Sequence, residues 1–193
     1  MRTLLYLGLE KPELNDTEIN LIHYPIIQII PKPPHECFLS FSKLPQFTHF
    51  IFTSKTSVSI FFKYLAIFSY FLADLREKQF IAVGQATAKS IKTYGIEKVL
   101  IAQNETAEGI VDLLKTMDLK NCYIFWPHSA LSRDVIHTFL SKKRLKFEAC
   151  VLYDTAPFLP KPLPDLNEVD EIVFTSPSTV SAFLKNFSIT SSR

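Results

Sequence analysis

The chain has 193 residues, of which 47% are hydrophobic and 21% charged, a composition that excludes a disordered protein and provides for a sizeable core. The formal net charge of +2 is too small to imply nucleic-acid binding, but it is compatible with a small anionic ligand. The three cysteines, Cys37, Cys122 and Cys150, are an odd number without metal or redox spacing, so we expect buried thiols in a reducing compartment.

Neither a secretory signal nor a membrane span is expected. The N-terminal sequence reaches Glu10 before any long apolar run. The richest apolar stretch, Tyr64 to Ala73, falls well short of the roughly 20 residues that span a bilayer, and we expect its aromatic side chains to fill a core. We therefore expect a cytoplasmic protein that does not contact a membrane.

Strand-like segments begin the chain. We expect strands at Leu4 to Leu7 and Ile26 to Ile30, and the first of them should be central in its sheet. The proline cluster Pro31 to Pro34 then predicts an extended exit, because proline restricts both itself and the residue before it. A loosely apolar segment, Cys37 to Phe41, leads from there to a strand at Phe50 to Phe52.

Strands and helices then alternate. Further strands are expected at Phe80–Val83, Val99–Ile101, Tyr123–Trp126, Phe147–Tyr153 and Glu171–Phe174. Helical apolar spacing follows most of them, which predicts parallel sheets covered on both faces. In such sheets ligands bind outside the carboxyl ends of the strands. The segment Thr155 to Asp165 carries four prolines and no apolar period, so we expect a stiff, extended linker there.

One unit occurs twice in the chain. Residues 51–63, IFTSKTSVSIFFK, return near the C-terminus as residues 173–185, VFTSPSTVSAFLK. In both copies a short apolar strand runs into Thr-Ser and then into a helix, and Pro177 suits the first helical position. The hydroxyls can simply cap the helix, which is the better interpretation of either turn alone. The N–H groups of such a helix end can also bind carboxylate or phosphate, and the repetition favours that second interpretation.

Residues that commonly carry catalysis are sparse. The four glycines form no dinucleotide or nucleoside triphosphate motif, and the five histidines show no metal spacing. His128 lies beside Ser129 in an expected turn, where we expect a surface histidine rather than a catalytic base. What remains is a site of hydroxyl-bearing turns and helix N-termini, which suits a polyanion bound by positioning.

Five segments together resemble the uroporphyrinogen-III synthase family, which closes hydroxymethylbilane to uroporphyrinogen III in tetrapyrrole (haem) biosynthesis. They are, in order, IFTSKTSV (51–58), AVGQATA (82–88), TAEGIVDLL (106–114), VLYDT (151–155) and VFTSPSTV (173–180). Their order and separation across nearly the whole chain make the combination fairly specific. The resemblance implies a monomeric lyase that uses no metal or cofactor, acts on a linear tetrapyrrole polycarboxylate, and binds no nucleic acid.

The resemblance also implies an architecture and a site. It implies two α/β domains with parallel sheets, joined by two extended linkers, with the ligand in the cleft between them. The expected domains are residues 1–34 plus 160–193, which form a shortened first domain, and residues 35–155. The expected substrate-binding residues are Ser54, Gly84, Thr87, Ser176 and Ser178.

Tyr153 is the catalytic residue that the resemblance implies. Loss of the hydroxymethyl oxygen as water gives an electrophilic azafulvene, and ring D must then be inverted through a spiro intermediate. Orientation and directed donors suit this task better than a strong nucleophile does. A phenol keeps its proton at neutral pH, so Tyr153 can donate to the departing hydroxyl. A hinge tyrosine bonded to the backbone is the alternative, and we weigh the two equally.

Two departures from the family pattern concern the first domain. The segment after its first strand has little room for a full helix, and the family's second Gly-Thr-Thr-Ala turn is absent because the chain ends at Arg193. The rival hypothesis is a non-catalytic two-domain protein that binds a small anion, or an inactive relative of the family.

Overall fold

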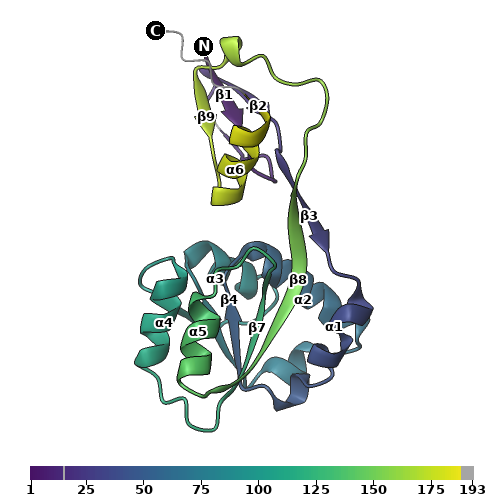
Figure 1. The fold of residues 1–193 in the computed structure, drawn as a ribbon, viewed down its shortest axis with the longest axis vertical. Helices are drawn as coiled ribbons and strands as arrows, with labels where there is room; N and C mark the ends of the chain where they lie inside the picture. Colours follow the sequence, from purple (N-terminus) through teal and green to yellow (C-terminus); the bar gives the residue numbers. More distant parts are fainter. Residues whose placement is uncertain (15, 188–193) are drawn as a thin grey trace. The chain divides into compact units, whose positions relative to one another are not determined.

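The computed structural model describes residues 1–14 and 16–187 and divides into two units (Figure 1). Unit 1 comprises Met1–Ile30 and Thr155–Arg193, and unit 2 comprises Pro31–Asp154. Each unit contains a sheet whose central strands pair in parallel, with helices packed against it. The expectation of two α/β units with parallel sheets is therefore confirmed.

Unit 2 is built around a six-stranded sheet with the strand order β3-β8-β7-β4-β5-β6. The strands of this sheet are β3 (Ile27–Pro31), β4 (His49–Phe52), β5 (Gln79–Ala82), β6 (Val99–Ile101), β7 (Tyr123–Ser129) and β8 (Lys146–Pro157). Residues 27–30 of β3 and 155–157 of β8 belong to unit 1. Its helices are α1 (Pro34–Phe41), α2 (Lys55–Ile67), α3 (Gln85–Lys92), α4 (Ala107–Lys115) and α5 (Val135–Lys142). The chain runs outward from β4 to β5 and β6 and then returns to β7 on the other side of β4, so the strand order reverses between β4 and β7.

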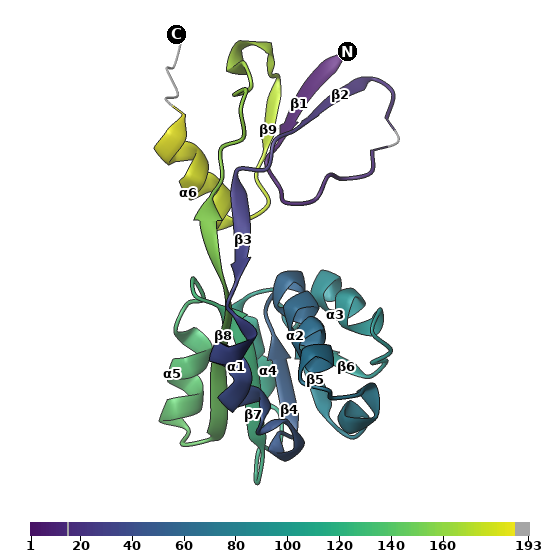
Figure 2. The ribbon, with the colours of Figure 1, turned by 90° about the vertical axis from the view of Figure 1, so that its right-hand side faces the viewer.

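The two faces of this sheet have different cores. One face is aromatic, because Phe50 on β4 packs against Phe80, Phe125 and Phe61, and Phe61 lies on α2. The other face is mainly aliphatic and is covered by α4 and α5, whose Ile110 and Leu140 are fully buried. Figure 2 shows α2 and α3 on the side of the sheet opposite to α5. Unit 2 thus has the doubly covered parallel sheet that the alternation of strands and helices predicts.

The chain passes between the units along two strands, β3 and β8, which are neighbours in the sheet. Within unit 2, Lys32 donates its backbone N–H to the carbonyl of Leu152 at 2.8 Å. The Lys32 ammonium also pairs with the Asp154 carboxylate at 2.7 Å. The carboxylate holds the pKa of Lys32 above its usual value. Within unit 2, the last residues of β8 are therefore bonded to Lys32, the residue that follows β3.

Unit 1 contains a three-stranded sheet with the order β2-β1-β9 and both pairs parallel. Its elements are β1 (Arg2–Tyr6), β2 (Ile19–His23), β9 (Glu171–Val173) and α6 (Pro177–Asn186). The predicted central position of the first strand is confirmed. The core forms where Leu5 and Leu7 meet Phe183 of α6, and all three side chains are buried.

The structure differs from the sequence-based expectations in two segments. The proline cluster is extended only as far as Pro33, which has φ −53° and ψ 137°, because Pro34 is the first residue of α1 and Cys37–Phe41 is helical. Proline is well suited to that position, since its missing N–H is unpaired there anyway. In unit 1, β2 forms at Ile19–His23, where no strand was predicted.

The apolar stretch at residues 64–73 fills a core only in part. Tyr64 and Leu65 are buried, but Phe71 is 71% exposed and Leu72 is 46% exposed. Within the described residues, no helix combines the length and the apolar character that crossing a membrane requires.

Candidate functional site

The candidate site of unit 2 lies at the carboxyl edge of its sheet. Ser54 follows β4, Gly84 follows β5, and the segment from Ser129 follows β7. Because these strands are parallel and adjacent, their carboxyl ends share one edge. Tyr153 reaches the same edge on β8, where it is paired in register with Ser129. The reversal of strand order between β4 and β7 is the place where ligands bind in open parallel sheets.

The repeated turn has the same geometry in both copies. Ser54 is the N-cap of α2 with φ −160° and ψ 153°, and Ser176 is the N-cap of α6 with φ −165° and ψ 160°. Each serine oxygen accepts a hydrogen bond from the backbone N–H three residues later, at Ser57 (3.0 Å) and Thr179 (3.3 Å). Pro177 occupies the first helical position. The predicted capping role of these turns is confirmed.

The third helical position of three helices carries a buried hydroxyl. Ser57 in α2, Thr87 in α3 and Thr179 in α6 are at most 4% exposed. The Ser57 and Thr179 hydroxyls donate to the carbonyls of their N-cap residues at 2.8 and 2.7 Å. Thr87 differs, because its hydroxyl has no hydrogen bond to any described residue. The Thr87 hydroxyl is therefore available to water or to a ligand at the start of α3.

Tyr153 is 5% exposed and its hydroxyl lies 3.0 Å from the Ser54 oxygen. Each serine hydroxyl has one proton. Ser57 uses its proton on the Ser54 carbonyl, and Ser54 directs its own proton to the Ser57 oxygen at 3.1 Å. Tyr153 is consequently the donor in its contact with Ser54. The sequence analysis considered Tyr153 as a donor to the departing hydroxyl or as a hinge residue bonded to the backbone, and neither alternative included Ser54. In the structure the phenol bonds to the hydroxyl of this helix cap.

The N-terminus of α3 holds a carboxylate of the chain itself. Gly84 is the N-cap and has no side chain to accept from the helix. Glu105, in the segment between β6 and α4, accepts from the Gln85 N–H at 2.8 Å. This contact shows that the start of α3 binds a carboxylate, as expected for unpaired N–H groups at a helix end. Glu105 was not a sequence-based candidate.

Unit 1 brings Ser176 and Ser178 together at the start of α6. Their hydroxyl oxygens lie 2.8 Å apart. Gly8 follows β1 at the carboxyl edge of this smaller sheet, and a Cβ there would lie 2.8 Å from a methyl carbon of Thr175. His23, at the end of β2, contacts the Gly8 carbonyl at 2.8 Å. Gly8 and His23 therefore lie at the carboxyl edge that leads into the Ser176 turn, although the sequence did not single them out.

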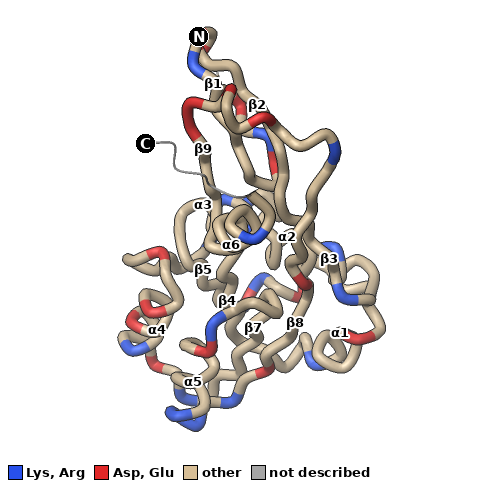
Figure 3. Tube along the Cα trace, turned by 45° about the horizontal axis from the view of Figure 1, so that its top comes forward, with Lys and Arg blue, Asp and Glu red and all other residues tan. Residues whose placement is uncertain are grey.

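The basic run at residues 142–146 lies away from the Tyr153 edge. Lys142 ends α5, and Lys146 begins β8, so the run is at the amino end of that strand. Lysines and arginines gather at this end of α5 in Figure 3. Near the carboxyl edge, Arg133 makes two 2.7 Å contacts with the Glu108 carboxylate, and this pairing lowers the pKa of Glu108. The Arg133 guanidinium is therefore already paired within unit 2.

His128 is partly buried and lies near the end of β7, so the expectation that it lies in a turn is wrong. Its ring stacks on Trp126 with the centroids 4.1 Å apart, and its Nδ1 lies 2.9 Å from the Ser129 carbonyl. Among the described side chains, the Trp126 indole nitrogen is the one buried polar atom without a hydrogen-bond partner. Burial lowers the pKa of His128, and His137 adds to this effect, whereas the Ser129 carbonyl and Asp134 oppose it.

Acidification should destabilise unit 2 through two histidines. Burial lowers the pKa of His128 and of His49, which contacts the Thr48 hydroxyl. An unfolded histidine takes up a proton below about pH 6.5, whereas these folded ones resist it, so the unfolded state binds more protons. We expect the free energy of unfolding, measured by urea titration, to fall as the pH drops below that value. His49→Gln should flatten the dependence, and His35→Gln, at an exposed position, should not. An unfolding free energy that stays level from pH 7 to pH 5.5 would contradict this.

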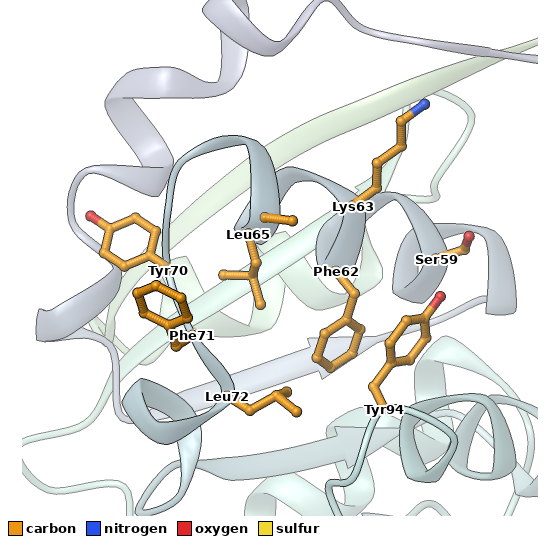
Figure 4. Close-up of a pocket in the computed structure, with 9 residues that line it drawn as sticks. Ser59, Phe62, Lys63, Leu65, Tyr70, Phe71, Leu72 and Tyr94 are labelled. Carbon is orange, nitrogen blue, oxygen red and sulfur yellow. The ribbon is translucent and has the colours of Figure 1, made fainter.

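An apolar pocket of about 430 Å³ lies on α2, outside the candidate site (Figure 4). Phe62, Leu65, Phe71 and Leu72 line it, and the Tyr94 and Ser59 hydroxyls lie at one end. It contains none of the residues that the sequence predicted for substrate binding. Within the described part of the chain, no cluster of three His, Cys, Asp or Glu residues is arranged to hold a metal ion.

The structure thus groups the sequence-predicted site residues by unit. Ser54, Gly84, Thr87 and Tyr153 share the carboxyl edge of the sheet of unit 2, and Ser176 and Ser178 belong to unit 1. Sequence reasoning missed Ser57 and Glu105. Ser57 could have been found, because it stands where Thr179 stands in the repeat. Glu105 could not, since it is remote from Gln85 along the chain.

The chain is similar in sequence to known proteins. A sequence model described as Uroporphyrinogen-III synthase HemD matches residues 11–192. The porphyrin biosynthesis protein HemD of Ruminiclostridium josui is 26% identical over 174 residues, which are 84% of this chain. The match covers only 34% of that relative, so this chain spans about a third of its length.

Two solved structures have a similar fold. A mutant uroporphyrinogen III synthase from the extremely thermophilic bacterium Thermus thermophilus is 14% identical with a TM-score of 0.67, covering 96% of this chain and 77% of that one. The uroporphyrinogen-III synthetase of Helicobacter pylori 26695 is 19% identical with a TM-score of 0.63, covering 99% of this chain and 81% of that one. At these identities the similarity concerns the fold.

Proposed function

The chain belongs to the uroporphyrinogen-III synthase family, and we propose that it cyclises hydroxymethylbilane to uroporphyrinogen III, with loss of water and inversion of ring D. It would therefore act as a lyase of haem biosynthesis. The observation that carries the proposal is the carboxylate bound at the N-terminus of α3, beside the unpartnered hydroxyl of Thr87. The substrate is a polycarboxylate, and this edge of unit 2 offers the donors that carboxylates require.

The proposed roles follow from the contacts. Thr87 and the backbone around Gly84 bind one substrate carboxylate at α3. Tyr153 donates its proton to the departing oxygen after turning that proton away from Ser54, and Ser54 holds the phenol in position before the reaction. Ser176 and Ser178 in unit 1 bind a further carboxylate. We also propose a cytoplasmic monomer that needs no metal or cofactor.

The reaction asks the protein to select a conformation. Without an enzyme, the azafulvene closes on the unsubstituted carbon of ring D and gives the uninverted isomer I. A site that fixes the carboxylates of several rings can instead hold the substituted carbon against the azafulvene, which leads to the spiro intermediate. Directed N–H and O–H donors supply this positioning without a charged nucleophile.

The test is to supply freshly prepared hydroxymethylbilane, oxidise the products to porphyrins, and separate the isomers. Isomer III above the level of a protein-free control supports the proposal. Isomer I alone, at the uncatalysed rate, would contradict it. In that case the competing hypothesis, a non-catalytic small-anion binder or an inactive relative, would account for the same donors.

Thr87→Ala should reduce the formation of isomer III by about tenfold or more, because the hydroxyl makes no hydrogen bond within the described chain and serves the substrate. The substitution should lower the unfolding free energy by only about 1 kcal/mol, because it deletes a buried methyl group but breaks no hydrogen bond within the described chain. Initial rates of isomer III formation and urea denaturation measure the two effects.

Thr93→Ala is the matched control, because Thr93 lies at the opposite end of α3 and its hydroxyl donates to the Ser90 carbonyl. That variant should keep the wild-type rate. A Thr87→Ala protein that retains full activity, or loses it only together with its folded structure, would remove Thr87 from the site.

A further inference from the structure

Glu105 accepts a hydrogen bond from the backbone N–H of Gln85, a donor that a substrate carboxylate at this helix end would also use. Its carboxylate accepts from the Gln85 N–H at 2.8 Å, in the first turn of α3. The Glu105 side chain is exposed, and this is its one hydrogen bond among the described residues. A substrate carboxylate bound at the start of α3 and the Glu105 carboxylate therefore compete for the same N–H and the same partial positive charge.

The glycine before the helix keeps the space for this carboxylate open. A Cβ at Gly84 would lie 2.2 Å from the Glu105 carboxyl carbon, far closer than atoms pack. The Gly84 backbone has φ −169°, an extended conformation that any residue can adopt. A side chain at Gly84 would therefore displace the Glu105 carboxylate from its present position, although the backbone conformation would allow one.

We infer that Glu105 is an internal competitor of the substrate: it fills the carboxylate position at the start of α3 in the free protein and leaves when substrate binds. The inference rests on the proposed function and deepens it. Release of Glu105 is inexpensive, because an exposed carboxylate regains water when it leaves the helix end. A ligand with several carboxylates gains binding free energy from its other contacts, which offsets the cost of displacing Glu105. A ligand with a single carboxylate has no other contact to offset that cost. The contact therefore favours polycarboxylates.

The inference predicts that removing a side chain tightens binding. Binding of uroporphyrin III, a stable polycarboxylate, can be titrated by the quenching of Trp126, the one tryptophan of the chain. Glu105→Ala should lower the dissociation constant about two- to fivefold, the size expected for one freed contact at an exposed helix end. Glu105→Gln should have a smaller effect, because the amide oxygen still accepts from Gln85 but carries no charge. In turnover assays KM should fall while kcat stays unchanged.

Glu97→Ala is the matched control, since it removes an equal charge from the opposite edge of the sheet. Glu97 is exposed and precedes β6, whereas Glu105 follows it. Its dissociation constant should stay at the wild-type value. If Glu105→Ala bound uroporphyrin III more weakly than the wild type, or equally well, the inference would be overturned and Glu105 would be a structural cap. If neither the wild type nor Glu105→Ala bound uroporphyrin III, the inference would also be overturned. The titration needs no turnover, so it is independent of the isomer analysis. If the wild-type protein made only isomer I, the proposed function would be refuted, but the titration would still test the role of Glu105.

Discussion

Tyr153→Phe should lower the turnover of hydroxymethylbilane to isomer III by about a hundredfold, the usual effect of losing a positioned proton donor. The phenol is 5% exposed and its hydroxyl lies 3.0 Å from the Ser54 oxygen, so the contact holds the donor in position at the carboxyl edge. The donor acts as the hydroxyl departs, and its loss removes stabilisation of the transition state more than of the bound substrate. The dissociation constant for substrate, from single-turnover kinetics, should therefore change little.

A second buried tyrosine of unit 2 provides the control. Tyr64 is 2% exposed and its hydroxyl donates to the Lys32 carbonyl, outside the candidate site. Tyr64→Phe should lower the unfolding free energy by about 1 kcal/mol or more, because a buried acceptor loses its partner, and should leave turnover unchanged. If Tyr153→Phe turned over as fast as Tyr64→Phe, Tyr153 would be a structural residue that orients the Ser54 cap.

Phe50→Ala should have the largest effect on stability, a loss of about 3–5 kcal/mol. Phe50 is fully buried at the centre of the aromatic face, stacked on Phe80 with ring centroids 5.0 Å apart. It also meets Phe125 edge to face at 5.9 Å and lies 5.5 Å from Phe61. Truncation removes the buried area and these ring contacts together, and the sheet cannot close over the cavity. Urea denaturation followed by the fluorescence of Trp126, which lies in unit 2, measures the loss.

The comparison for Phe50 is Phe71, a phenylalanine of the same unit that is 71% exposed. Phe71→Ala should change the unfolding free energy by no more than about 0.5 kcal/mol. A similar cost for both variants would mean that the aromatic cluster is not the main source of stability in unit 2.

Local signals in the sequence were sufficient for the repeated turns. Ser54 and Ser176 cap their helices as predicted because capping involves only the next three residues. Strand β6 appears at the predicted residues, Val99–Ile101, since a short apolar run between polar residues has few alternatives. The helix at Pro34 was missed because proline both ends an extended segment and starts a helix, and the sequence does not say which.

The contacts that define the candidate site were beyond local reasoning. Glu105 meets Gln85 only because β5 and β6 pair in parallel, which brings the segments that follow them together. Tyr153 meets Ser54 because β7 and β4 lie side by side and β8 lies next to β7. Such pairs depend on strand order and register, which no window of neighbouring residues contains.

The two-part composition of unit 1 has a consequence for how the protein is made. Strand β1 pairs with β9, so that Leu4 stands opposite Glu171. On the ribosome, β1 and β2 emerge before unit 2 and have to wait for β9, roughly ten seconds or longer at ordinary synthesis rates. Unit 2 emerges during that interval as one continuous stretch and can fold alone. Strand β1 is thus made before unit 2 but can complete its own sheet only after unit 2 has been made.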